Sequence, residues 1–405
     1  ERSALLHKIA DSYLERQDEL ARIVAGEMGK PVAQAKGEIG LVAEIYRYYA
    51  DNAEQLLAPN TIDVDSGSAS VEKRPVGVLL GIMPWNYPHY QVARFVAPNF
   101  MAGNTIILKH APQCPKTAEV IADMFKEVGV PEGVYNNIFA TNEQAATIIH
   151  DKRVQGISLT GSERAGQAVA KEAGGALKKV VLELGGSDAF IVAADADIKQ
   201  AIKGAISGRF GNAGQACNAA KRLIVIESVY DKFVEGFTNA VSNMTLADPL
   251  KEDTFIGPMS SKAAAVNLQA QLDSAIQAGA TVLVEGGMDK DKPGAWFKPA
   301  VLTDVTESMD VYREELFGPV AVVYKARDVD HAIKIANDVP FGLGASIQTQ
   351  DAALAADIAD KLEVGMVTIN APSGTEANTP FGGVKRSGFG RELGTLGITE
   401  FLNYK

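Results

Sequence analysis

Apolar and charged residues alternate with helical spacing over residues 1–56. Leu5, Leu6 and Ile9 begin a series of apolar positions that recur three or four residues apart, with charged side chains between them. Such spacing is typical of amphipathic helices. Gly29-Lys30-Pro31 interrupts the series, because Gly and Pro terminate helices. The pattern predicts a pair of surface helices.

Residues 57–75 change to a short alternation of apolar and polar positions. Ile62, Val64 and Val71 alternate with polar residues, and Ser66-Gly67-Ser68 stands between them. A period of two residues around a Gly/Ser turn predicts an exposed β-hairpin. A projecting ribbon of this kind commonly contacts another subunit.

Short apolar runs separated by helical patterns follow from residue 76 onward. Alternation of strands and helices predicts a parallel sheet covered by helices on both faces, with ligands bound beyond the carboxyl ends of the strands. A second series of strands follows Gly185-Gly186, where we expect a domain boundary. The predicted strands are Val76–Ile82, Thr105–Leu108, Val134–Ile138, Gly156–Thr160 and Val180–Leu184, then Phe190–Val192, Leu223–Ile226, Thr281–Glu285, Val320–Tyr324 and Val367–Asn370.

Composition and charge narrow the function classes. The 405 residues, 46% hydrophobic and 22% charged, have the balance of a globular protein of roughly two to three domains. The 39 basic and 50 acidic residues give a net charge of −11 without a basic cluster. A nucleic-acid partner is not expected, because phosphate binding needs a positive surface. No apolar run approaches the ~20 residues of a membrane helix, so no membrane insertion is expected.

The cysteine content bears on metal binding and compartment. Cys114 and Cys217 are the only two cysteines, and there are five histidines. Two cysteines cannot build a disulfide framework, and neither they nor the histidines have the spacing of a metal site. We therefore expect no metal ion, and we expect a reducing compartment, most simply the cytoplasm.

Three residues have the chemistry and the neighbours of catalytic groups. Cys217 lies in a loop of small residues, which suits a nucleophilic thiolate; the alternative is an inert buried cysteine. Glu183 ends an apolar run, where burial favours a general base, or else it caps the strand end. Asn86, held between two prolines, can donate to an oxyanion or can stabilise its own turn.

A fourth segment suits phosphate binding. Thr160-Gly161-Ser162 follows a predicted strand and opens a predicted helix, so its free amides and the helix dipole can receive a pyrophosphate. The segment differs from the G-x-G-x-x-G pattern of dinucleotide-binding proteins, and Ser162 can also act simply as an N-cap.

Together these segments resemble the NAD(P)-dependent aldehyde dehydrogenase superfamily over nearly the whole chain. The resemblance implies an α/β fold with a Rossmann-like cofactor domain and an α/β catalytic domain. The motifs that carry it, in family order, are Pro84-Trp85-Asn86-Tyr87-Pro88, Leu108-Lys109, Thr160-Gly161-Ser162, Glu183-Leu184-Gly185-Gly186, Gly214-Gln215-Ala216-Cys217, Glu315-Leu316-Phe317-Gly318-Pro319, and Pro380-Phe381-Gly382-Gly383 with Ser387-Gly388.

The resemblance also divides the chain. It assigns residues 1–56 and 76–185 to the cofactor-binding domain, 57–75 to an oligomerisation hairpin, 186–385 to the catalytic domain and 386–405 to a C-terminal arm that returns to the cofactor domain. Family members assemble through that hairpin and arm. A homodimer or homotetramer is therefore expected.

A reaction scheme follows from the same resemblance. Cys217 attacks the aldehyde carbon, while Asn86 and the Cys217 backbone amide hold the oxyanion. Hydride then passes to the nicotinamide, and Glu183 deprotonates the water that hydrolyses the thioester.

The resemblance implies a set of cofactor residues as well. Pro112 stands where NAD-preferring relatives often have a Glu that binds the ribose 2′-hydroxyl, so NADP should be tolerated or preferred over NAD. His110 is a further candidate for contacting the 2′-phosphate. The implied cofactor residues are Lys109 on the adenosine ribose, Gly161 and Ser162 on the pyrophosphate, Glu315 on the nicotinamide ribose, and Trp85 and Phe317 flanking the cofactor.

The helix after Pro88 bears on the substrate. Its side that carries Tyr87, Tyr90, Gln91 and Arg94 lines the substrate tunnel in the family. Arg94 matches the arginine of succinate-semialdehyde dehydrogenases, and a guanidinium in a tunnel selects a carboxylate. The alternative is a surface arginine that faces a neighbouring subunit.

Four other positions bear on the binding of the substrate. Gly211 replaces a second arginine of better-known members, so Ser373 and Thr375 are expected to assist Arg94. Glu376 would oppose a carboxylate if it pointed inward.

The leading hypothesis is NAD(P)-dependent oxidation of succinate semialdehyde to succinate. Within the class, the alternative substrate is another small anionic or ω-amino aldehyde. From another class, the chain could be a cofactor-free cysteine thioesterase or hydrolase that uses Cys217 and Glu183, or a non-catalytic descendant.

Overall fold

The computed structural model describes residues 1–405 and begins with three helices. These are α1 (Arg2–Glu15), α2 (Gln17–Met28) and α3 (Val32–Leu56). The prediction of two surface helices was wrong, because three are present: a helix ends at Arg16 as well as at Gly29-Lys30-Pro31. It was also wrong for α3, whose apolar side is fully buried in the main core.

The first lobe is built on a six-stranded sheet in the order β20-β8-β7-β4-β5-β6. All neighbours are parallel except β20 and β8. The helices α1, α3, α4 and α5 cover one face of this sheet, and α6 and α7 cover the other. The elements are β4 (Val78–Ile82), α4 (Tyr90–Ala102), β5 (Thr105–Lys109), α5 (Pro115–Glu127), β6 (Tyr135–Ile138), α6 (Asn142–His150), β7 (Val154–Thr160), α7 (Glu163–Gly175), β8 (Lys179–Glu183) and β20 (Gly388–Phe389).

The second lobe is built on a seven-stranded sheet in the order β11-β14-β15-β10-β9-β17-β18. Only β11 runs antiparallel to its neighbour. The helices α8 and α9 pack on one face, and α10, α11 and α12 pack on the other. The elements are β9 (Asp188–Val192), α8 (Ile198–Phe210), β10 (Ala220–Ile226), α9 (Glu227–Ser242), α10 (Lys262–Gln277), β11 (Thr281–Val284), β14 (Ala300–Thr303), β15 (Val320–Ala326), α11 (Val329–Asn337), β17 (Gly344–Gln348), α12 (Ala352–Lys361) and β18 (Met366–Ile369).

Every strand predicted from the two apolar series is present, within one to three residues at its ends. The predictions omitted β14 and β17 of the seven-stranded sheet and the two-residue strand β20 of the six-stranded sheet. Strands β8 and β9 belong to different sheets, and the chain crosses between the lobes at Leu184–Ser187. The remaining short elements are β12 (Gly287–Met288), β13 (Phe297–Lys298), β16 (Phe341–Gly342), β19 (Val384–Lys385) and α13 (Gly394–Gly397).

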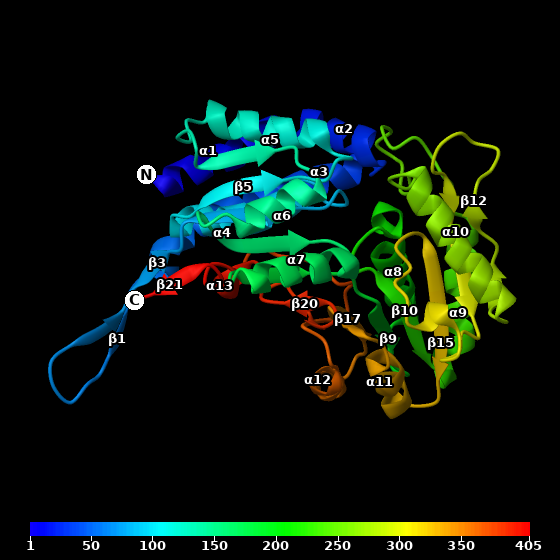
Figure 1. Ribbon diagram of the computed structural model, residues 1–405. Helices are drawn as coiled ribbons and strands as arrows, with labels where there is room; N and C mark the ends of the chain where they lie inside the picture. The colour runs from blue at the N-terminus through cyan, green and yellow to red at the C-terminus, as the bar shows by residue number, and fades with distance from the viewer.

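The predicted hairpin is present, and it projects away from both lobes (Figure 1). It consists of β1 (Asn60–Ile62) and β2 (Ala69–Val71), paired antiparallel. The following strand β3 (Lys73–Pro75) pairs with β21 (Leu402–Tyr404), which brings the C-terminus to the base of the hairpin. The domain limits and the homodimer or homotetramer that the hairpin and arm would join stay predictions. None of the helices combines the length and apolar character that a bilayer crossing requires.

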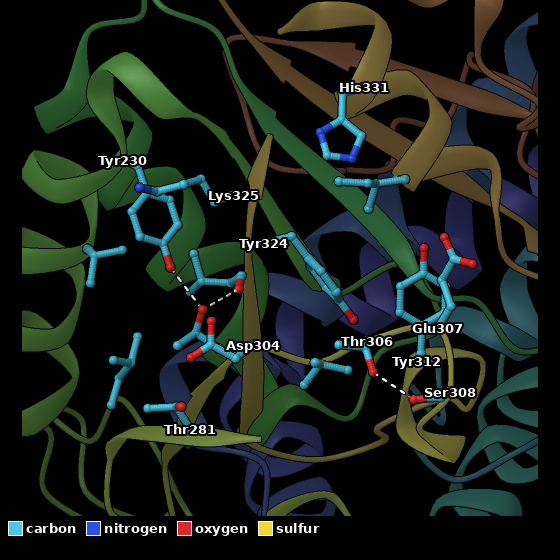
Figure 2. Close-up of a pocket in the computed structure, with 16 residues that line it drawn as sticks. Tyr230, Thr281, Asp304, Thr306, Glu307, Ser308, Tyr312, Tyr324, Lys325 and His331 are labelled. Carbon is cyan, nitrogen blue, oxygen red and sulfur yellow. Dashed lines mark hydrogen bonds between the residues drawn. The ribbon is translucent and has the colours of Figure 1, made fainter. Parts of the chain in front are cut away.

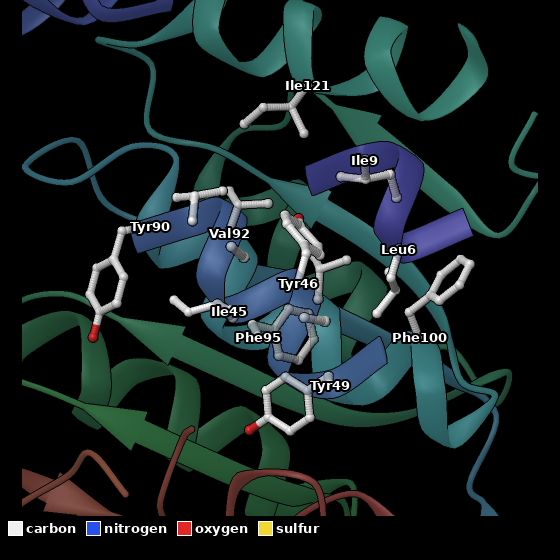
Figure 3. Close-up of a cluster of buried hydrophobic side chains, with 14 of the residues drawn as sticks. Leu6, Ile9, Ile45, Tyr46, Tyr49, Tyr90, Val92, Phe95, Phe100 and Ile121 are labelled. Carbon is white, nitrogen blue, oxygen red and sulfur yellow. The ribbon is translucent and has the colours of Figure 1, made fainter. Parts of the chain in front are cut away.

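The main core of the first lobe contains several fully buried aromatic side chains, and Figure 3 shows Tyr46 near its middle. The rings of Tyr46 and Tyr13 stack at 5.7 Å, and Phe125 contacts Tyr46 edge-on at 6.2 Å. The Tyr46 hydroxyl has no hydrogen-bond partner, whereas the Tyr49 hydroxyl donates to the Gly394 carbonyl at 3.0 Å.

The two tyrosines give a paired stability prediction. Tyr46→Phe should leave the melting temperature unchanged or raise it, because the substitution removes a buried hydroxyl that has no hydrogen-bond partner. Tyr49→Phe should lower the melting temperature, because the Gly394 carbonyl loses its hydrogen-bond donor. Tyr46→Ala should lower the melting temperature by about 10 °C, because the substitution leaves a cavity in the core. Thermal unfolding of the three variants followed by circular dichroism tests this. Equal losses for the two phenylalanine variants would contradict it.

Candidate active site

A cavity of about 260 Å³ between the two lobes carries many of the predicted site residues. The first lobe contributes α3 and the start of α4 to its wall. The second lobe contributes the loop before β10 and the loop after β18. The lining residues are Gly37, Glu38, Leu41, Tyr87, Tyr90, Gln91, Cys217, Asn218, Ser373, Gly374, Thr375 and Phe381.

A larger cavity, of about 970 Å³, lies on the second lobe near the ends of β14 and β15 (Figure 2). Tyr230, Tyr324 and Lys325 stand on its wall, and the Tyr230 hydroxyl lies 2.9 Å from the Thr303 hydroxyl. None of the predicted site residues lies there. Cavity size therefore does not locate the site in this protein, and the chemistry of the lining residues does.

Cys217 reaches the smaller cavity from a constrained loop. Helix α8 ends at Phe210, and Asn212 and Ala213 in the turn that follows both have φ of 52°. This left-handed conformation is uncommon for residues other than glycine. This turn places Cys217, which is partly exposed, on the wall of the cavity.

Asn86 is tied to the same loop. Its side-chain amide donates to the Gln215 carbonyl at 3.1 Å, and the Asn212 amide donates to the Asn86 carbonyl at 3.0 Å. A carboxamide has two N–H donors, so one of them remains for a ligand. The structure therefore holds an amide donor close to the backbone of the Cys217 loop.

Glu183 occupies the carboxyl end of β8 with only 2% of the residue exposed. Neither of its carboxylate oxygens has a hydrogen-bond partner. Burial raises the pKa of Glu183 well above its ordinary value; the nearby Arg94 partly offsets the rise, and the Glu392 carboxylate adds to it. A carboxyl with a raised pKa is suited to accept and release a proton near neutral pH.

The glycines after Glu183 let the two lobes meet. A Cβ on Gly186 would lie 2.7 Å from the Cys217 carbonyl oxygen, which is closer than real side chains approach. The end of the segment that carries Glu183 therefore contacts the backbone of Cys217. The Glu183 charge also raises the pKa of the Cys217 thiol, so the two residues that the sequence singled out as candidate base and nucleophile lie near each other.

Burial also raises the pKa of the Cys217 thiol, to about 12. The positive charges of Arg94 and Lys221 lower the pKa but do not cancel the effect of burial. The thiol is therefore protonated at neutral pH in the structure described. A nearby base has to remove its proton when the sulfur acts as a nucleophile.

The prediction that Arg94 lines the substrate tunnel was wrong. Its side chain is 0% exposed, lies behind the cavity wall and forms an ion pair with Glu392. Its guanidinium also donates to the Tyr90 hydroxyl at 3.2 Å and to the Thr160 hydroxyl at 3.0 Å. The alternative of a surface arginine is excluded by the same burial. Helical spacing put Arg94 on the correct side of α4, but Tyr90 stands between it and the cavity.

The other predicted substrate residues do line the cavity. Tyr87, Gln91, Ser373 and Thr375 contribute to its wall, and the side-chain amide oxygen of Gln91 has no hydrogen-bond partner. The Tyr90 hydroxyl lies 3.5 Å from the Thr375 hydroxyl. Glu376, in contrast, is exposed and does not reach the cavity, so its charge does not oppose an anionic ligand there.

The residues implied for the adenosine half of the cofactor lie at the carboxyl ends of β5 and β7, the two strands that flank β4. Lys109 ends β5 and forms no ion pair, and burial lowers the pKa of its ammonium. Ser162 is the N-cap of α7 and accepts from the Ala165 amide at 3.3 Å, as its alternative role predicted. A buried cation without a counter-ion and the amides of a helix N-terminus fit a phosphorylated dinucleotide.

The prediction that His110 assists with a phosphate was wrong. Its ring is buried, with Nε2 donating to the Pro88 carbonyl at 2.8 Å and Nδ1 accepting from the Ala111 amide at 2.8 Å. Burial lowers the pKa of His110 to about 4. The ring is neutral at pH 7 and both nitrogens are occupied, so it offers no charge to a phosphate.

Trp85 and Phe317, implied to flank the cofactor, and Glu315, implied for the nicotinamide ribose, lie near the junction of the two lobes. The rings of Trp85 and Phe317 meet edge-on with centroids 5.8 Å apart. The Glu315 carboxylate accepts from the Gly186 amide at 3.1 Å and pairs with the Lys221 ammonium at 3.0 Å. These residues therefore lie beside the loop that carries Cys217.

The whole chain, residues 1–405, matches the profile of the aldehyde dehydrogenase family. The chain belongs to that family. It is 51% identical over its full length to the NADP⁺-dependent succinate-semialdehyde dehydrogenase of Deinococcus radiodurans, of which it spans 85%. It is 42% identical over 402 residues to the NAD(P)⁺-dependent succinate semialdehyde dehydrogenase of Escherichia coli, covering 99% of this chain and 87% of the relative.

Solved structures agree with the sequence comparison. The succinic semialdehyde dehydrogenase of Streptococcus pyogenes, solved in complex with NADP⁺, superimposes with a TM-score of 0.98 at 41% identity. The match covers all of this chain and 88% of that one. The fold of this aldehyde dehydrogenase is thereby established as α/β with two sheet-based lobes.

Two charged residues of this aldehyde dehydrogenase site were missed by the sequence reasoning. Lys221 contacts the Cys217 loop from a fully buried strand, and Glu392 pairs with Arg94 beside Glu183. The signal for Lys221 was present: a lysine inside an apolar strand costs free energy unless it is paired. Glu392 had no comparable signal, because its pairing depends on the C-terminal segment folding back onto β8.

Proposed function

We propose that this aldehyde dehydrogenase oxidises succinate semialdehyde to succinate, with NADP⁺ preferred and NAD⁺ accepted. The observation that supports the proposal is the surroundings of Cys217: its thiol lines the cavity, the buried Glu183 carboxyl lies close enough to raise its pKa, and the Asn86 amide bonds to the same loop at the Gln215 carbonyl. The names of the relatives at 42 to 51% identity support the substrate and the cofactor.

The first step forms a bond between the Cys217 sulfur and the aldehyde carbon. The thiol gives up its proton to water as the bond forms, which leaves the Glu183 carboxylate for the second step. The carbonyl oxygen becomes an oxyanion, which the free N–H of the Asn86 amide and the Cys217 backbone amide hold.

Lys109, Ser162 and Glu315 are the residues that would hold the dinucleotide. When bound, NADP⁺ supplies a hydride acceptor, so that the adduct on Cys217 becomes a thioester. The unpaired Lys109 ammonium is the feature of this chain that favours a 2′-phosphate.

The second step hydrolyses the thioester. Glu183 removes a proton from water, the hydroxide adds to the acyl carbon, and the Cys217 sulfur leaves. The products are the carboxylic acid and a regenerated thiol. The raised pKa of Glu183 makes this step faster as the pH rises.

Recognition of the substrate carboxylate is assigned to hydroxyls rather than directly to Arg94. The Tyr90 hydroxyl accepts from the Arg94 guanidinium and directs its own proton to the Thr375 hydroxyl over a long 3.5 Å, so a carboxylate bound in the cavity can replace Thr375 as the acceptor. Thr375 and Ser373 offer two further hydroxyls on the opposite wall. Arg94 then contributes its positive charge through Tyr90.

This assignment predicts the substrate preference. With NADP⁺, kcat/KM for succinate semialdehyde should exceed that for butanal, which lacks the carboxylate, by about 10- to 100-fold, the contribution of hydrogen bonds to a charged group. Tyr90→Phe should remove most of that preference and leave butanal oxidation nearly unchanged. Initial rates with both aldehydes test it.

A wild-type enzyme with equal kcat/KM for the two aldehydes would contradict the proposed substrate. A Tyr90→Phe variant that kept the full preference would contradict the role of Tyr90 alone. Repeating the assay with NAD⁺ measures the cofactor preference at the same time.

A further inference from the structure

Lys221 is one of the buried charged residues of the second lobe, and it contacts the loop of Cys217. It lies on β10, where all seven residues are buried, and only 1% of it is exposed. Its ammonium donates to the Ala216 carbonyl at 2.8 Å and to the Cys217 carbonyl at 2.7 Å, and it pairs with the Glu315 carboxylate at 3.0 Å. All three ammonium protons are thereby used.

Two of these contacts fix the backbone on both sides of Cys217. A trans peptide unit is planar, so its carbonyl and its N–H point in opposite directions. When Lys221 holds the Ala216 carbonyl on one side, the Cys217 N–H of the same peptide unit has to point away from Lys221. The Cys217 carbonyl is held in the same way, so the Cα that carries the thiol is fixed between two anchored peptide units.

The third contact links this anchor to the neighbouring loop. The Glu315 carboxylate that pairs with Lys221 also accepts from the Gly186 amide at 3.1 Å, and Gly186 packs against the Cys217 carbonyl. The segment after Glu183, the loop of Cys217 and the segment of Glu315 therefore meet at one ammonium group.

Electrostatics add to the geometry. Hydrogen bonding to a carbonyl polarises its peptide unit and strengthens the N–H at the other end as a donor. The ammonium also lowers the pKa of the Cys217 thiol, against the larger effect of burial.

We infer that Lys221 is a positioning residue of the reaction: it orients the Cys217 amide toward the oxyanion and the thiol toward the aldehyde by anchoring the carbonyls of residues 216 and 217. The inference rests on the proposed function in assigning the amide to an oxyanion. Lys221 itself does not line the substrate cavity, so it acts through Cys217.

The test replaces Lys221 by methionine, which keeps the length and removes the charge. Lys221→Met should lower kcat for succinate semialdehyde by about 100-fold, as loss of an oriented oxyanion donor does, with KM for the aldehyde changed less than threefold. Alkylation of Cys217 by iodoacetamide without cofactor should slow about tenfold at pH 8, because the thiol loses a stabilising charge.

The matched control is Lys178→Met. Lys178 also donates to two backbone carbonyls, those of Ile149 and Asp151, but it does so on the first lobe away from Cys217. Its variant should keep the wild-type kcat and alkylation rate. If Lys221→Met matched Lys178→Met in both measurements, the inference would be overturned.

The test of Lys221 also covers a variant that does not fold and a wild type without aldehyde dehydrogenase activity. If Lys221→Met fails to fold, Lys221→Gln takes its place, since it is neutral and keeps a donor, and the same two readouts apply. If the wild type oxidises no aldehyde, the proposed function fails, and the alkylation rates alone decide the role of Lys221, because they require neither substrate nor cofactor.

Discussion

Replacing Cys217 by serine lowers kcat for aldehyde oxidation by about 10⁴-fold or more, the loss expected when a nucleophile is removed. A serine hydroxyl is far less acidic than a thiol, and the buried site already raises the pKa of the native thiol to about 12. Steady-state NADPH formation measures the loss. Binding of NADP⁺, measured by calorimetry, should be unchanged, because the implied cofactor residues do not include Cys217.

Cys114→Ser is the control for this experiment. Cys114 is buried at the N-cap of α5, and burial raises the pKa of its thiol. Its variant should keep the wild-type kcat. Full activity of Cys217→Ser would remove Cys217 as the nucleophile, and hydrolysis of thioesters in the absence of NADP⁺ by the wild type would favour the thioesterase alternative.

Glu183→Gln separates the two halves of the reaction. The acyl group should form on Cys217 in the first turnover but should not leave, so a burst of up to one NADPH per site precedes a steady-state rate about 10²- to 10⁴-fold below wild type. Glutamine has the same shape without the charge, and because neither Glu183 oxygen has a hydrogen-bond partner, the exchange breaks no contact. Stopped-flow absorbance measures the burst.

The pH dependence of the deacylation rate tests the same role of Glu183. The pKa of Glu183 is raised, so in the wild type the ionised form that activates water becomes more populated as the pH rises, and the deacylation rate should rise with it. The residual rate of Glu183→Gln should lack this increase. Hydroxylamine, a nucleophile that needs no base, should restore turnover. A variant with neither a burst nor rescue would show that Glu183 acts in the first half instead.

The orientation of the Arg94 side chain is not determined by the helical pattern of the sequence. Helical spacing correctly predicts that Arg94 and Tyr90 share one side of α4, because the period of a helix is a local property. Which of the two side chains reaches the cavity depends on what packs behind it. Glu392, from the C-terminal segment, draws the guanidinium away from the cavity and leaves the Tyr90 hydroxyl in front.

Local features were accessible from the sequence alone: the alternating strands and helices, the hairpin, the family motifs and the small residues of the Cys217 loop. Each depends on the period, the size or the backbone freedom of residues that are neighbours in the chain. Only the tertiary structure decided the charged contacts, among them Arg94 with Glu392 and Lys221 with Glu315. A buried charge must find a partner, but its partner can come from any part of the chain, and the folding of the two lobes onto each other selects which one it is.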